Sequence, residues 1–213
     1  MFKIFYAGAV LLVLLAACNK KSFSETLPKG VQKLQTEHRL SDPEKIEVLE
    51  FLWLGCSFCR KFHKNWVSLK KQLGDKVAFR AVPATFENWL FDARVYVSLK
   101  ELGLMNDGLL ANYYEARQGP QKAELSQDVQ AVARWLEQRY GTPAQDFLDI
   151  FGSSLVDDKL DEWGELIAKY PIDSVPIVLL SVPQRKESYL IHYTQGAATE
   201  KTILDLVKSS SSP

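Results

Sequence analysis

The chain has 213 residues, of which 46% are hydrophobic and 24% charged, as in an ordinary folded globular protein. Lysine plus arginine and aspartate plus glutamate number 26 each, so the formal net charge is zero. Nucleic-acid binding depends on an excess of basic residues, and this balance therefore excludes nucleic acid as an expected partner.

The N-terminus has the pattern of an export signal. Lys3 precedes an uncharged apolar run over residues 4–17, which is shorter than the ~20 residues that a membrane-spanning helix needs. The run leads into the sequence LAAC at residues 15–18, which resembles the lipobox of bacterial lipoproteins. The resemblance implies that residues 1–17 are removed and that Cys18 is acylated, and two or more acyl chains anchor a protein stably. A plain signal peptide followed by an incidental cysteine is the alternative.

The segment after Cys18 changes from a polar tether to strand and helix patterns. Residues 45–54 are rich in β-branched and aromatic side chains, which predicts a central strand buried on both faces. Apolar residues then recur at helical spacing from Phe58 to Leu73, and Gly74 ends this helix. The expected elements are a tether over 18–30, an edge strand over 31–40, a central strand over 45–54, a helix over 57–73 and a strand over 77–82.

Helical patterns fill most of residues 87–171, and strand patterns return afterwards. This order predicts an α/β protein with a thioredoxin-like fold, formed by residues 31–86 and 172–208, with a helical insertion over 87–171 between them. The remaining expected elements are helices over 89–102, 107–117, 127–140, 142–151 and 157–170, strands over 175–182 and 188–193, a closing helix over 199–208 and a disordered serine-rich tail over 209–213.

The other two cysteines, Cys56 and Cys59, form a C-x-x-C motif at the predicted start of a helix. The unpaired N–H groups and the positive end of the helix dipole favour a thiolate on the first cysteine, and the thiolate is the attacking species in disulfide exchange. We therefore expect Cys56 to be the nucleophile and Cys59 to resolve the mixed disulfide. Export to an oxidising compartment suits such a redox pair.

A metal site is the alternative use of these cysteines. His63 lies four residues after Cys59, which gives three potential ligands, and His38 or His192 could be a fourth. The sequence has no second C-x-x-C, so a four-cysteine zinc site within one chain is excluded. We expect no metal, and no cofactor besides the redox-active disulfide between Cys56 and Cys59.

Residues 48–62, VLEFLWLGCSFCRKF, resemble the active-site region of the DsbA family of periplasmic disulfide-forming oxidoreductases. The resemblance extends over most of the exported chain, including IDSVPIV at 172–178. It implies a cis bond between Val175 and Pro176 beside the dithiol, with Val175 at an edge that receives the substrate. It also implies that Glu50 is a buried proton acceptor beneath the dithiol. A strand-end glutamate that reaches solvent is the alternative.

The dipeptide between the cysteines departs from the best-known member of that family. It is Ser57-Phe58, where that member has Pro-His. The histidine there stabilises the thiolate and Phe58 cannot, so we expect a milder oxidant, with Phe58 exposed to apolar segments of unfolded substrates. Arg60 and His63, on the same predicted helix, are candidates for tuning the dithiol, although each also fits a surface position.

These features predict a cell-envelope thiol–disulfide oxidoreductase that introduces disulfides into exported proteins. The expected partners are unfolded or partly folded exported proteins with free cysteines and a DsbB-like, quinone-linked membrane reoxidant. We expect a periplasm-facing monomer anchored by lipid on Cys18, and Asn19 resembles the pattern that sorts lipoproteins to the outer membrane. A reductase or isomerase of the same fold is one alternative. A metal-binding or metallochaperone lipoprotein that uses Cys56, Cys59 and His63 is another.

Overall fold

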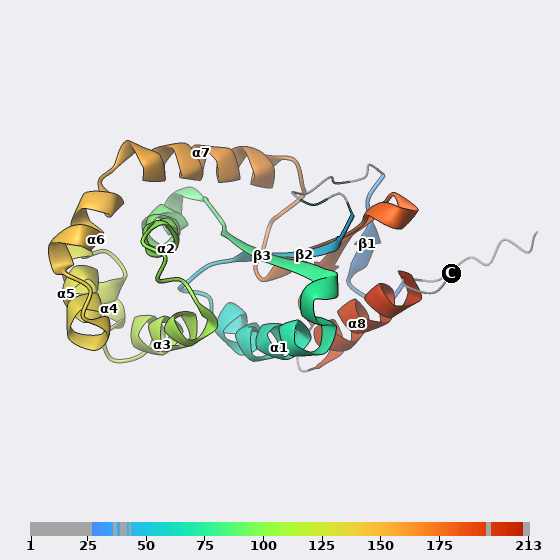
Figure 1. Cartoon of the computed structure of the whole chain (residues 1–213), viewed down its shortest axis with the longest axis horizontal. Coiled ribbons are helices and arrows are strands. Elements are labelled where there is room, and N and C mark those ends of the chain that lie inside the picture. Colours follow the sequence, from blue (N-terminus) through green and yellow to red (C-terminus); the bar gives the residue numbers. More distant parts are fainter. Residues whose placement is uncertain (1–26, 36–37, 39–41, 43, 195–196, 211–213) are drawn as a thin grey trace, which may run out of the picture.

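The computed structural model describes residues 27–35, 38, 42, 44–194 and 197–210. They form a five-stranded mixed sheet with helices on both faces and a helical region at one end (Figure 1). The predicted signal peptide, Cys18 and residues 211–213 lie outside the described residues. The strands are β1 (Val31–Lys33), β2 (Ile46–Leu52), β3 (Val77–Pro83), β4 (Ile177–Val182) and β5 (Glu187–His192), and the α-helices are α1 (Ser57–Leu73), α2 (Leu90–Glu101), α3 (Asp107–Gln118), α4 (Lys122–Leu125), α5 (Val129–Tyr140), α6 (Ala144–Phe151), α7 (Ser154–Ala168) and α8 (Ala198–Ser210).

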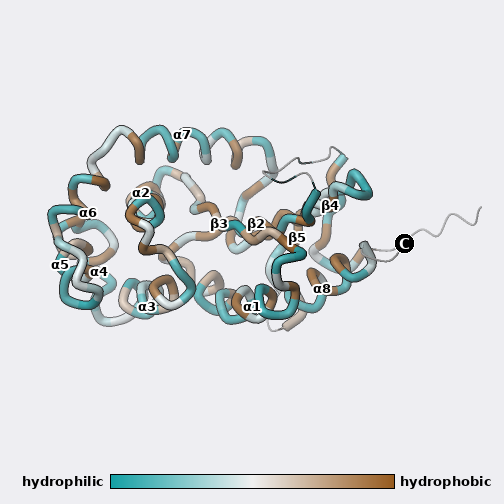
Figure 2. The backbone as a smooth tube through the Cα atoms, in the orientation of Figure 1, coloured by the Kyte–Doolittle hydropathy of each residue, from teal (hydrophilic) through white to brown (hydrophobic). Residues whose placement is uncertain are grey.

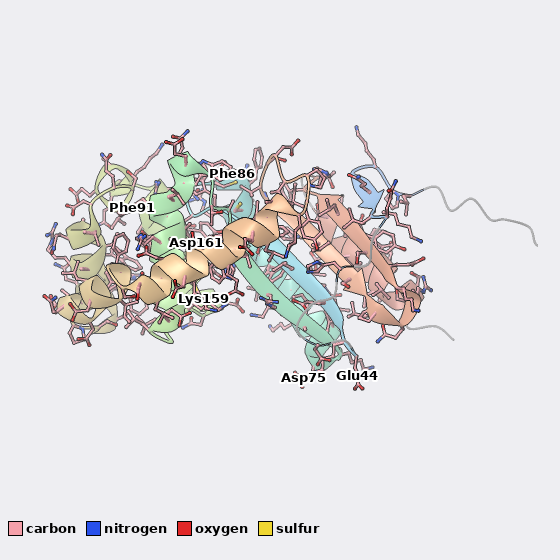
Figure 3. All side chains as sticks on the ribbon, turned by 90° about the horizontal axis from the view of Figure 1, so that it is seen from above. Glu44, Asp75, Phe86, Phe91, Lys159 and Asp161 are labelled. Atoms are coloured by element: carbon pink, nitrogen blue, oxygen red, sulfur yellow. The ribbon has the colours of Figure 1, made fainter. Side chains whose placement is uncertain are left out.

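The strand order is β1-β5-β4-β2-β3, which places β2 inside the sheet. β2 pairs in parallel with β3 and antiparallel with β4, and all its residues are buried, so the predicted central strand is confirmed. α1 is the crossover that the parallel pair needs. The carboxyl ends of β2 and β3 therefore lie at the same end of the sheet. Figure 3 shows Phe86, which follows β3, at this end, and Glu44 and Asp75 at the other.

Two hydrophobic clusters hold the sheet between the helices. On one face, Phe62 of α1 and Ile203 of α8 cluster with Val48 of β2. α7 crosses the other face (Figures 1 and 3), and its residues alternate between hydrophilic and hydrophobic (Figure 2), as a helix with one buried side requires. The second cluster runs from Leu49 and Phe51 of β2 into the helical region, so the sheet and the insertion share a core.

β1 ends at Lys33, and the edge strand predicted over 31–40 was too long. Side chains hold the backbone at His38: its N–H donates to Ser188 Oγ (2.8 Å), and its carbonyl accepts from Ser181 Oγ (2.6 Å). The two serines satisfy backbone groups that would otherwise need strand partners.

The helix boundaries differ from the predictions by up to three residues. α8 extends to Ser210, so the predicted tail began too early; Ser209 and Ser210 both donate to the carbonyl of Leu206, and their hydroxyls are satisfied within the helix. α7 starts three residues before the predicted start, directly after Ser153, whose backbone is extended and whose hydroxyl donates to the carbonyl of Ile150 (2.7 Å). The short helix α4 was not predicted. Among the described residues, no helix is long and apolar enough to cross a membrane.

Candidate functional site

Cys56 and Cys59 lie at the N-terminus of α1, directly after β2. Both are free thiols; Cys56 is 7% exposed and Cys59 is fully buried. Cys56 is the N-cap residue of α1, and its Sγ accepts a hydrogen bond from the N–H of Cys59 (3.2 Å). The turn before it needs Gly55, because a Cβ there would lie 2.3 Å from the ring of Trp53. Of the two sulfurs in the motif, that of Cys56 is therefore the more accessible, as the exposed fractions show.

The two thiols have opposite acidities. A hydrogen bond from the Cys59 thiol lowers the pKa of Cys56 from 9.0 to about 7, and the backbone N–H groups of Cys59 and Phe58 act in the same direction against the effect of burial. Burial raises the pKa of Cys59 well above its ordinary value, and its bond to Cys56 and the charges of Cys56 and Glu50 raise it further. The pair therefore favours a thiolate on Cys56 and a protonated Cys59.

The loop before β4 brings Val175 and Pro176 to the dithiol. The Cys56 thiol donates to the Val175 carbonyl, with 3.4 Å between Sγ and oxygen. The Val175–Pro176 peptide bond is cis. β4 begins only at Ile177, so the backbone of Val175 lies outside the sheet ladder and next to the reactive sulfur. An extended peptide could pair with the chain at this point.

Glu50 is buried in the middle of β2, between Ala81 of β3 and Val178 of β4. It is 2% exposed, and its Oε1 has no hydrogen-bond partner among the described residues. Burial raises the pKa of Glu50 well above its ordinary value, and the charges of Cys56 and Asp107 raise it further. The alternative of a strand-end glutamate that reaches solvent is therefore wrong. This carboxyl group holds its proton to a higher pH than an exposed one, near the buried thiol.

The residues between the cysteines face solvent. Ser57 is exposed, and Phe58 is 40% exposed. Lys61 Nζ lies 5.3 Å from the centre of the Phe58 ring, and the ring of Tyr193 lies 5.8 Å from it. The expected exposure of Phe58 is confirmed, and its ring is an apolar surface beside Cys56.

Arg60 and His63 both contact the helical insertion. Arg60 Nη1 lies 3.1 Å from Glu115 Oε2 of α3, so its charge is paired. His63 is 5% exposed, and its Nε2 lies 2.9 Å from the backbone oxygen of Asp107. The surface position considered for His63 is therefore wrong.

The helical insertion also holds the backbone that leads to Cys56, through residues that the sequence did not single out. Each contact joins positions at least 25 residues apart, and no local pattern marks them. The contacts are Gln118 Nε2 to the carbonyls of Leu54 and Cys56 (3.0 Å each), Trp53 Nε1 to Asp92 Oδ2 (2.7 Å), and Arg117 to both oxygens of Asp92 (2.9 and 2.8 Å).

The residues considered as metal ligands are not brought together. Within the described part of the chain, no group of three or more histidine, cysteine, aspartate or glutamate side chains could hold a metal ion. His63 Nε2 is engaged with the carbonyl of Asp107, and the ring of His38 packs against Tyr170 at 5.0 Å between centres.

This chain is similar to known proteins that are named for thiol:disulfide interchange. No protein-family model matches it. It is similar to the thiol:disulfide interchange protein DsbA of Burkholderia cepacia (27% identity, 84% of this chain and 82% of that protein) and of Azotobacter vinelandii (26%, 70% and 68%). Similar solved structures are Pseudomonas aeruginosa DsbA (TM-score 0.70, 22% identity, 84% of this chain and 88% of that chain) and the oxidoreductase NmDsbA1 from N. meningitidis (0.70, 19%, 90% and 95%). These structures confirm the predicted thioredoxin-like fold with a helical insertion.

Proposed function

Because this chain is a DsbA-like thiol–disulfide oxidoreductase, we propose that it introduces disulfides into exported proteins through Cys56 and Cys59. A client thiolate attacks Cys56 Sγ, the bond between the two cysteines breaks, and Cys59 leaves as a thiolate that takes a proton from Glu50. A second client thiolate then attacks the client sulfur of the mixed disulfide. The client disulfide forms, and Cys56 leaves as a thiolate.

The strongest support for this direction is the difference between the two thiols. The pKa of Cys56 is lowered to about 7, so its thiolate is a good leaving group in the second step. Lowering the pKa of a thiol by one unit stabilises its thiolate relative to the protonated form by about 1.4 kcal/mol. Stabilising the reduced form in this way makes the disulfide form an oxidant.

We assign client binding to the surface around Cys56. The backbone of Val175, which lies outside the sheet ladder, suits main-chain pairing with an extended segment, and the exposed ring of Phe58 suits an apolar side chain. Pairing through the main chain tolerates many sequences, as a protein that acts on many clients requires.

Trapping experiments in cells test the role of each cysteine. In Cys59→Ser the Cys56 thiolate attacks client disulfides but cannot be released by a resolving thiol, so mixed disulfides are expected to accumulate. Cys56→Ser is expected to form none. Acid quenching, alkylation and non-reducing electrophoresis measure these species, and wild-type protein is expected to be oxidised at rest. Wild-type protein found reduced would favour the reductase or isomerase alternative, and the absence of mixed disulfides would contradict the oxidoreductase role.

Titration of the reduced protein tests the oxidising strength. Thiolate absorbance is expected to rise with a midpoint at about pH 7, the pKa of Cys56. Cys59→Ala is expected to raise this midpoint, because the hydrogen bond from Cys59 is the largest cause of the lowered pKa. Cys56→Ser supplies the blank. A midpoint at about 3.5, the value of the strongly oxidising DsbA, would contradict a milder oxidant.

We propose further that the protein is a periplasm-facing lipoprotein. The LAAC pattern and Asn19 support a lipid on Cys18 and an outer-membrane location. A monomer is sufficient, since both cysteines and Pro176 come from one chain, and a DsbB-like quinone-linked protein would reoxidise it. Labelling with radioactive palmitate is expected to mark the wild-type protein but not Cys18→Ser; equal labelling of both would contradict the anchor.

A further inference from the structure

Gln118 of α3 bonds the backbone on both sides of Gly55. Its Nε2 lies 3.0 Å from the carbonyl oxygen of Leu54 and 3.0 Å from that of Cys56. Carbonyl oxygens only accept hydrogen bonds, so the amide nitrogen, with its two N–H donors, is the atom that faces them. One side chain of the helical insertion therefore holds the residue that bears the reactive sulfur, although the two lie 62 positions apart in the sequence.

The way in which α3 ends determines where this amide lies. Gln118 is the last residue of the helix, and Gly119 follows as its C-cap. A Cβ at Gly119 would lie 2.6 Å from the carbonyl oxygen of Glu115, so this helix end needs a glycine. Pro120 comes next, and a proline there cannot continue the helix.

Buried contacts fix α3 against its neighbours. Arg117 bonds both oxygens of Asp92 on α2 (2.9 and 2.8 Å), and Asp92 in turn accepts from Trp53 Nε1 (2.7 Å), in the segment that leads to the dithiol. One turn earlier in α3, the ring of Tyr114 lies 6.0 Å from the ring of His63 on α1, between centres. The amide at the end of α3 is therefore a fixed point from which the dithiol segment is held.

The turn that Gln118 holds determines the position of the Cys56 sulfur. The N–H of Cys56 donates to the carbonyl of Trp53 (3.0 Å), which closes the turn, and Gly55 within it has no side chain to restrict its backbone. The extended backbone of Cys56 (φ −83°, ψ 118°) directs Sγ to the N–H of Cys59, 3.2 Å away. A turn released from Gln118 is free to move the sulfur away from this donor.

The thiolate of Cys56 depends on that position. Among the described residues, hydrogen bonds are what lowers the pKa of Cys56: they come from the Cys59 thiol and from the N–H groups of Cys59 and Phe58, and burial opposes them. Hydrogen bonds weaken steeply as their distance and angle depart from the ideal. A small displacement of Sγ is therefore expected to weaken the groups that stabilise its negative charge.

We propose that Gln118 is a positioning residue of the dithiol, whose amide fixes the turn that carries Cys56 and thereby stabilises the Cys56 thiolate. This inference rests on the proposed function, in which that thiolate leaves when the client disulfide forms. The bonds of Gln118 go to backbone carbonyls, so it acts through Cys56 and not on the client. In this way the helical insertion sets the oxidising strength of a dithiol that belongs to the thioredoxin-like part.

Gln118→Met tests the contact, because methionine has a similar length and no N–H donor. Titration of the reduced protein by thiolate absorbance is expected to show a midpoint about one pH unit above the wild-type value of about 7, a tenfold loss of acidity on the scale of one hydrogen bond. Gln118→Lys keeps N–H donors and adds a positive charge, so its midpoint is expected at or below that of the wild type.

Equilibration with glutathione tests the consequence for oxidising strength. Cys56 attacks oxidised glutathione and forms a mixed disulfide, Cys59 expels the remaining glutathione, and the protein disulfide forms as both halves of oxidised glutathione leave reduced. A less stable Cys56 thiolate shifts this equilibrium toward the protein disulfide. The equilibrium constant of Gln118→Met is expected to exceed that of the wild type about tenfold at about pH 9, and to equal it below about pH 6, where the thiol is protonated in both proteins.

Asn112→Leu is the matched control. Asn112 is also a half-buried amide on α3, but its Nδ2 donates to the hydroxyl of Tyr140 (2.9 Å), within the insertion. This variant is expected to match the wild type in both assays, while urea unfolding compares the stability that it and Gln118→Met lose.

Three results would overturn the proposal. The first is a wild-type midpoint in Gln118→Met, and the second is an equal rise of the midpoint in Gln118→Met and Gln118→Lys. The third is a glutathione equilibrium that changes by the same factor at every pH, as an effect on the fold alone would produce. If the wild-type protein forms no disulfide between Cys56 and Cys59 with glutathione, the proposed function itself fails, and the titration still tests the contact.

Discussion

Glu50→Gln is expected to be more stable than the wild type at neutral pH, and the gain is expected to grow with pH. Burial raises the pKa of Glu50 well above its ordinary 4.5, so the folded protein binds this proton more tightly than the unfolded chain does. The free energy of unfolding of the wild type therefore falls as the pH rises from about the pKa of Glu50 in the unfolded chain toward its pKa in the folded protein. This one group lowers it by up to about 1.4 kcal/mol per pH unit. Glutamine does not titrate and avoids this loss.

The same substitution is expected to slow the chemistry. Glutamine has the shape of glutamate but cannot exchange a proton with Cys59, so the release of glutathione by Cys59 is expected to fall by about 10²-fold at neutral pH. The attack on Cys56 from outside is expected to be less affected, because the pKa of that thiol is lowered mainly by hydrogen bonds from Cys59 and Phe58. A variant that is both more stable and slower would place Glu50 among the residues that trade stability for activity.

Urea unfolding of the oxidised protein at a series of pH values measures the stability effect. Glu47→Gln is the matched control: Glu47 is also buried in β2, but it lies 3.3 Å from Arg80 Nη1, so losing its charge is expected to bring no gain that grows with pH. A stability difference between Glu50→Gln and wild type that does not change with pH would show that Glu50 is ionised in the folded protein.

Local sequence patterns were sufficient for the parts of the site that one segment carries. The C-x-x-C motif between a buried strand and an amphipathic helix predicts Cys56 at the start of that helix, because periodicity and capping depend on neighbours in sequence. The expectations for Glu50 and Pro176 needed the family resemblance. Local sequence alone cannot say that a glutamate in a strand is buried, or that a loop 119 residues after Cys56 lies beside its thiol.

The contributions of the helical insertion could not be predicted in this way. An amphipathic pattern shows which face of a helix is apolar but not which surface it covers. Gln118 and Tyr114 belong to a helix whose pattern gives no sign that it packs beside the dithiol. His63 is buried because α3 packs against α1, and the sequence of α1 is equally compatible with an exposed position.

Asp92→Ala is expected to lower the free energy of unfolding by about 3–5 kcal/mol, the usual cost of breaking a buried ion pair. Arg117 and Asp92 are 5% and 3% exposed, and the substitution leaves the guanidinium buried without its two carboxylate contacts. It also removes the acceptor of Trp53 Nε1, three residues before Cys56. A loss of this size is a large part of the ~5–15 kcal/mol that stabilises a typical domain. Urea unfolding measures it.

The stranded charge, rather than the lost contact, is expected to account for most of this effect. Asp157→Ala removes the partner of Arg94 at a partly exposed pair and is expected to cost less than about 1 kcal/mol. Replacing both partners in Asp92→Leu with Arg117→Met removes the uncompensated cation and is expected to recover most of the stability, because apolar side chains of similar volume commonly replace buried ion pairs without loss. If the double variant is as unstable as Asp92→Ala, the hydrogen bond to Trp53 is the dominant contribution, and the insertion stabilises the fold mainly through the turn that carries the dithiol.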